Sequence, residues 1–104
     1  MFETIKSLFG AKLKTDFAQL IKNGAIVVDV RTPAEFESGH IAGAINIPVD
    51  QIAKNLHKLK DKNKPVITCC ASGMRSAAAK QFLISKGYHE VYNGGGWTNL
   101  RGKL

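Results

Sequence analysis

The sequence predicts an α/β domain built around a mainly parallel sheet, and three observations support this fold class. Residues 25–30, AIVVDV, are an uninterrupted run of mostly β-branched apolar residues, typical of a strand buried on both faces of a sheet. Segments with helical spacing alternate with short strand-like runs, as parallel strands joined by crossovers require. The length of 104 residues suits one domain spanning residues 1–104, without internal repeats or a linker.

Two helices are predicted before the first strand. Phe2, Ile5 and Phe9 have roughly helical spacing, which predicts a short N-terminal helix. Residues 15–24 predict a clearer helix, in which Thr15 is the N-cap and Asn23–Gly24 mark the end.

A capping box follows the first strand directly. Thr32 is the expected N-cap, Pro33 occupies the first helical position and Glu35 the third. The helix that begins here is expected to end near Gly39, and residues 43–48 predict a short second strand.

The second half continues the alternation of helices and strands. The expected order is a helix at 50–59 capped by Asp50, a strand at 65–69, a helix at 75–86, a strand at 89–93, a turn at 94–96 and a final helix at 97–101. The side chains expected to face inward are Ile52, Leu56 and Leu59 in the first of these helices, and Ala78, Ala79, Phe82 and Leu83 in the second.

Composition limits the classes of function. The net charge of +7 raises the question of nucleic acid, but the lysines concentrated in residues 54–64 lack interleaved aromatic residues. We interpret them as a solvated face, with an acidic partner or the steering of anions as the alternative, and expect no nucleic-acid partner. No apolar run could span a membrane and no signal peptide is recognisable, so a cytoplasmic protein without a membrane partner is expected. No histidine and cysteine spacing suggests a metal site.

The two cysteines, Cys69 and Cys70, are adjacent, and a bond between them would need a strained ring. They are therefore expected to be free thiols in a reducing compartment. Alternation along a strand points them in different directions, so one can pack while the other opens into the following loop. Cys69 is interpreted mainly as a core residue, with a resolving or regulatory thiol as the alternative.

The loop after Cys70 leads straight into a helix N-terminus. Its backbone N–H groups, from residues 71 to 76, can converge on one point, and Gly73 allows the backbone to curl. Such donors stabilise a thiolate, which makes Cys70 the candidate nucleophile. Arg75 can add a positive charge or tie the loop to a carboxylate. Asp29 and Arg31, which follow the first strand, are expected at the same edge of the sheet as supporting residues.

Three segments resemble the rhodanese family of sulfurtransferases: DVRTPAEFESGHIAGAINIP at 29–48, CASGMRS at 70–76 and NGGGWTNL at 93–100. The resemblance covers about residues 15–101 and implies a rhodanese-like fold, a parallel sheet flanked by helices on both faces. It also implies a catalytic cysteine that carries a sulfane sulfur as a persulfide, and it places that cysteine at Cys70. The sequence departs from the family pattern at Leu100, where a second tryptophan is common.

The expected function is therefore sulfur transfer from a small anionic donor such as thiosulfate to cyanide, a thiol or a protein, by a monomer without a cofactor. The expected substrate-binding residues are those of the loop: Ala71, Ser72, Gly73, Met74, Arg75 and Ser76. A persulfide carrier or protein-binding module with little turnover is the alternative. Phosphatases and arsenate reductases of similar fold place five residues between cysteine and arginine, whereas this loop has four. The shorter spacing favours sulfur transfer over phosphatase or arsenate reductase activity.

Overall fold

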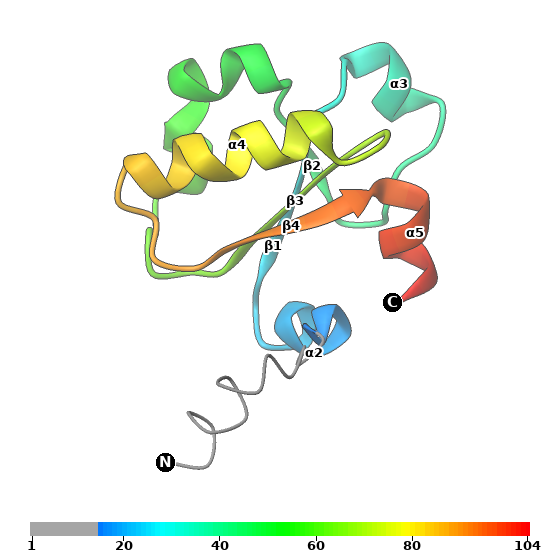
Figure 1. Ribbon diagram of the computed structural model, residues 1–104, viewed down its shortest axis with the longest axis horizontal. Helices are drawn as coiled ribbons and strands as arrows, with labels where there is room; N and C mark the ends of the chain where they lie inside the picture. The colour runs from blue at the N-terminus through cyan, green and yellow to red at the C-terminus, as the bar shows by residue number, and fades with distance from the viewer. Residues whose placement is uncertain (1–14) are drawn as a thin grey trace.

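The computed structural model describes residues 15–104, and the helix predicted from Phe2, Ile5 and Phe9 lies outside them. A four-stranded sheet forms the centre of the described chain, with all pairings parallel and the strand order β2-β1-β3-β4. The strands are β1 (Ile26–Asp29), β2 (Ile45–Asn46), β3 (Val66–Cys70) and β4 (Val91–Gly96) (Figure 1). The predicted fold class is confirmed.

Helical segments cover both faces of this sheet. They are α2 (Phe17–Lys22), α3 (Pro33–Glu37), the 3₁₀ segment η1 (Val49–Leu59), α4 (Met74–Ser85) and α5 (Trp97–Gly102). One buried cluster joins the sheet to η1 and α4, through residues such as Ile52 and Leu83. A second joins the other face to α5 through Leu100 and, more loosely, to α2 through Leu20. Within residues 15–104 no helix is long and apolar enough to cross a bilayer.

The predicted capping box is present. The side-chain oxygen of Thr32 accepts a hydrogen bond from the backbone N–H of Glu35, and the Glu35 carboxylate accepts one from the backbone N–H of Thr32. Pro33 occupies the first turn, so α3 begins immediately after β1. The carboxyl end of β1 is thereby joined directly to a rigid helix start.

Several local predictions were wrong in detail. Asp16, not Thr15, caps α2, because its carboxylate accepts the N–H of Gln19 at 3.0 Å. Residues 49–59 form 3₁₀ turns broken at Asn55, and Asp50 lies inside the segment rather than at its cap. The predicted strand at 43–48 pairs with β1 only at residues 45 and 46. Ala78 is exposed, because α4 turns Ser76, Ala79 and Leu83 inward.

The glycines at 94–96 continue β4 instead of forming the predicted turn. The register of β3 against β4 shifts there, from Thr68 opposite Asn93 to Cys70 opposite Gly96, so β4 uses one more residue than β3. A Cβ on Gly96 would lie 2.9 Å from the carbonyl oxygen of Ala71, which only glycine avoids. The glycines therefore let β4 approach the loop that follows Cys70.

Candidate active site

Cys70 is the last residue of β3, and the three residues after it lead into α4. Gly73 caps this helix with φ of +104°, in the left-handed region where a side chain would be strained. The turn directs backbone donors back to the sulfur. The N–H of Gly73 lies 2.9 Å from Cys70 Sγ, and the N–H of Ser76 lies 3.4 Å from it.

These contacts lower the pKa of the Cys70 thiol. Burial is the largest influence and favours the neutral thiol. It is outweighed by the hydrogen bond between the sulfur and the Ser76 side chain and by those from the backbone N–H groups of Ser76, Gly73 and Ser72, so the pKa lies below that of an ordinary cysteine. The Ser76 oxygen is 3.4 Å from Sγ. The loop therefore favours a thiolate without a histidine.

The pKa of the Cys69 thiol is shifted in the opposite direction. It packs in the cluster on the α2 and α5 side of the sheet, whereas Cys70 belongs to the cluster on the α4 side, as strand alternation predicted. Burial, with a further contribution from the nearby carboxylate of Asp29, raises the pKa of Cys69 to about 12. This thiol is neutral and enclosed at physiological pH.

Asn93 connects the loop to β4, and the sequence analysis missed it. Its Oδ1 accepts hydrogen bonds from the Ser76 hydroxyl at 2.6 Å and from the N–H of Gly95 at 2.9 Å. Its Nδ2 donates to the carbonyl oxygen of Gly73 at 3.2 Å. One amide thus holds two of the residues that contact the Cys70 sulfur. Its position directly before the three glycines was the one feature of the sequence that could have indicated this role.

Arg75 is tied to a carboxylate, one of the two roles expected for it. Its guanidinium donates to both carboxylate oxygens of Glu35, at 2.7 and 3.1 Å. The hydrogen bond from Arg75, together with that from the backbone of Thr32, lowers the pKa of Glu35 to about 2. Glu35 therefore caps α3 and also fastens α4 to α3, whereas Arg31, for which an ion pair with Glu35 or Asp29 was expected, pairs with Asp29. The charge of Arg75 is therefore compensated.

Asp29 and Arg31 form a buried ion pair beneath the loops. The guanidinium of Arg31 contacts both carboxylate oxygens of Asp29 at 2.7–3.1 Å, and it also donates to the carbonyl oxygen of Gly39 at 2.6 Å. It stacks on the Trp97 ring, 4.6 Å from the centroid. With Arg31 3% exposed and Asp29 fully enclosed, both residues brace the segment between β1 and β2.

The mouth of the loop carries no free charge. Ala71 and Ser72 are exposed, and Met74 is 80% exposed. Cys70 itself is only 1% exposed, because the loop closes around its sulfur. The exposed side chains of the loop are therefore neutral, and the most exposed of them, Met74, is apolar. Among residues 15–104 there is no cluster of histidine, cysteine and carboxylate side chains that could hold a metal.

Fold and site together define a class: a parallel α/β domain that presents a cysteine within a ring of N–H donors at the carboxyl end of its sheet. The chain belongs to the rhodanese-like domain family, whose model matches residues 13–103.

Relatives with curated names support this membership. The chain is 42% identical over 81 residues to the uncharacterized protein YqhL of Bacillus subtilis, and the match covers 77% of this chain and 64% of YqhL. It is 39% identical over 74 residues to the thiosulfate sulfurtransferase PspE of Escherichia coli, with 70% and 71% of the two chains covered.

Solved structures agree on the fold. A rhodanese with anions from E. coli superposes with a TM-score of 0.69 at 35% identity, over 73% of this chain and 91% of that one. Reduced Bacillus anthracis CoADR-RHD gives a TM-score of 0.72 at 35% identity. In that comparison 85% of this chain is covered, but only 15% of the much longer chain.

Proposed function

We propose that this protein is a sulfurtransferase in which Cys70 carries the sulfur as a persulfide. The observation that carries the proposal is the environment of Cys70: a sulfur held by N–H donors of Gly73 and Ser76, with its pKa lowered. The similarity to PspE, named as a thiosulfate sulfurtransferase, makes thiosulfate the donor to test first.

The reaction follows from this environment. The Cys70 thiolate attacks the outer sulfur of thiosulfate, a new S–S bond forms, and the old S–S bond breaks as sulfite leaves with the electron pair. Cyanide or a thiolate then attacks the outer sulfur of the persulfide. The bond to Cys70 breaks, and its electron pair returns to Sγ as the thiolate. The loop N–H groups stabilise negative charge on sulfur at both stages.

Intact-mass measurement after thiosulfate treatment tests the proposal directly. The wild-type protein should gain the mass of one sulfur and lose it again on addition of cyanide. Cys70→Ser should show neither the gain nor turnover, while Cys69→Ser, the matched control, should keep most of both. Loss of the mass gain in Cys69→Ser with its retention in Cys70→Ser would contradict the assignment.

A second candidate, a persulfide carrier served by another protein, is favoured by one observation. The only charged side chain of the loop, Arg75, is paired with Glu35, and the most exposed loop residue, Met74, is apolar. A doubly charged donor thus meets a compensated cation, whereas a protein could bury Met74 on docking. Comparison of kcat/KM for thiosulfate with the rate of single sulfur transfer from a protein persulfide separates the two. Slow turnover with fast protein-to-protein transfer favours the carrier.

A further inference from the structure

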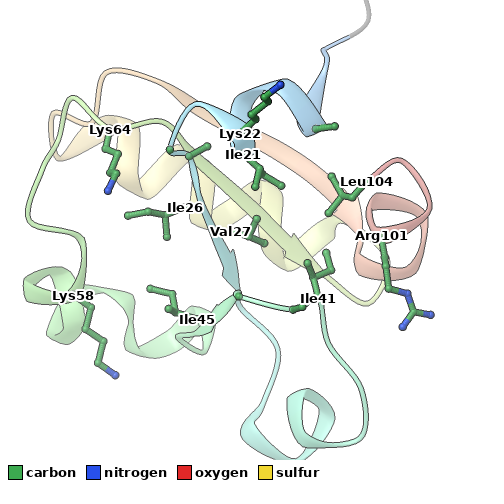
Figure 2. Close-up of a pocket in the computed structure, with 15 residues that line it drawn as sticks. Ile21, Lys22, Ile26, Val27, Ile41, Ile45, Lys58, Lys64, Arg101 and Leu104 are labelled. Atoms are coloured by element: carbon green, nitrogen blue, oxygen red, sulfur yellow. The ribbon is translucent and has the colours of Figure 1, made fainter.

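A cavity of about 840 Å³ lies away from the Cys70 loop, between α2, the start of β1 and the segment that leads into β2 (Figure 2). None of its lining residues belongs to residues 70–76. The volume falls within the range of small-molecule sites, roughly 300–1,000 Å³. Its walls are mainly aliphatic, formed by Ile21, Ile26, Val27, Ile41, Ile45 and Leu104.

Positive charge surrounds these apolar walls. Lys22, Lys58, Lys64 and Arg101 all line the cavity, and Figure 2 shows them on separate elements around its edge. None of the lining side chains is acidic. None of the four cations forms an ion pair with another residue between 15 and 104. Four like charges beside one cavity create a local potential that attracts an anion.

We propose that this cavity binds a medium-chain fatty acid, with the alkyl chain against the aliphatic walls and the carboxylate among the lysines and Arg101. The apolar walls offer no hydrogen bonds to a small polar anion, so phosphate alone would gain little from entering. The basic edge offers a neutral amphiphile nothing for its headgroup. Residues 1–14 carry three lysines and one glutamate, so that segment of the chain shares the charge of the cavity edge. Only an apolar chain with an anionic end complements both features.

The test is displacement of a fluorescent fatty acid from the full chain by laurate and by dodecanol. The wild-type protein should bind laurate more tightly than dodecanol. Added salt should lower the affinity for laurate but not that for dodecanol. Replacing two edge cations, Lys58→Gln with Lys64→Gln, should weaken the binding of laurate about tenfold, because two exposed charges that attract the carboxylate are removed. Ala42→Trp, which adds bulk at an exposed lining position, should block both ligands.

The matched control is Lys54→Gln with Lys60→Gln, which removes the same charge from exposed positions outside the cavity and should leave binding unchanged. An equal effect of both double variants would overturn the proposal, as would absence of binding or equal affinity for dodecanol. Two further outcomes overturn it by assigning another occupant. If laurate binds only after Phe2, Ile5 and Phe9 are replaced by serine, residues 1–14 occupy the cavity in the wild-type protein. If the protein self-associates and Ala42→Trp abolishes this, the cavity is occupied by a second copy of the chain.

This inference is independent of the proposed sulfur chemistry. Cys70→Ser should bind laurate as the wild-type protein does, because the cavity includes no residue of the loop. Failure of sulfur transfer and failure of fatty-acid binding would therefore be separate results.

Discussion

Two adjacent thiols differ because successive residues of a strand face opposite sides of the sheet. Cys69 is enclosed beside Asp29, and its pKa is raised to about 12, whereas the pKa of Cys70 is lowered by the loop donors. At pH 7 iodoacetamide should therefore modify Cys70 much faster than Cys69, as measured by mass spectrometry on Cys69→Ser and Cys70→Ser. A rate profile for Cys70 with its inflection at or above about 8.5, the value of a free thiol, would refute the role of the loop.

The Ser76 hydroxyl is a second residue-scale test, because it is the largest of the influences that lower the pKa of Cys70. Ser76→Ala should raise this pKa. It should slow alkylation at pH 7 by at most about tenfold, because the Ser76 hydroxyl also donates to Asn93 and its contact with Sγ is weaker than a full hydrogen bond to a charged group. Rates are best compared across pH in the Cys69→Ser background.

Ser72→Ala is the matched control for Ser76→Ala. Ser72 is exposed and assists Cys70 through its backbone N–H, which alanine retains. Its alkylation profile should match that of the parent. If both variants shift the profile equally, the effect belongs to the loop as a whole and not to the Ser76 hydroxyl.

At the scale of elements, Glu35 joins α3 to the start of α4 through Arg75. The pKa of Glu35 is about 2, below the ordinary value of 4.5. A lowered folded-state pKa contributes stability that is present above 4.5 and is lost as pH falls toward 2. Because both side chains are more than a third exposed, this contribution should be at most about 1 kcal/mol.

Glu35→Gln should remove that part of the pH dependence while keeping an oxygen for the capping box. Urea midpoints at pH 5 and pH 3 measure the effect: the wild-type protein should lose more stability between the two than the variant does. Glu37→Gln, on the same helix but outside this ion pair, should behave as the wild type. Identical losses for all three proteins would show that the pair does not contribute.

Loop length is the second test at this scale. Four residues separate Cys70 from Arg75, and one glycine inserted after Gly73 makes five. The ring of N–H donors should widen, so sulfur transfer should fall and hydrolysis of an aryl phosphate can be sought. Circular dichroism and thermal melting establish that the variant is folded. Undiminished sulfur transfer in a folded variant would remove loop length as the reason to prefer sulfur over phosphate.

The elements also show which features a sequence can predict. The capping box of Thr32 and Glu35 depends on residues three positions apart, so the local sequence pattern was enough to predict it. The contacts of Asn93 with Ser76 and of Arg75 with Glu35 join residues 17 and 40 positions apart, and they depend on the finished sheet. The same holds for the glycines of β4, whose extended pairing is set by β3 and not by their own turn preference.

For the whole molecule, the sheet separates two cores, and Leu100 tests whether they act independently. Leu100 is fully buried between α5 and the sheet, on the face opposite Cys70. Its side chain occupies the space next to Gly94, where an added Cβ would lie 2.8 Å from it, so the absence of a side chain at position 94 leaves room for Leu100.

Leu100→Ala should therefore cost about 2–5 kcal/mol of unfolding free energy, as buried leucines typically do. For a domain near 100 residues that corresponds to a Tm lower by roughly 8 °C or more. Leu104→Ala, at a position 47% exposed, should change the Tm little. At 25 °C the alkylation rate of Cys70 should stay near the wild-type rate, because its donors belong to the loop and α4. A large fall in that rate in folded Leu100→Ala would show that β4 transmits packing on one face to the loop on the other.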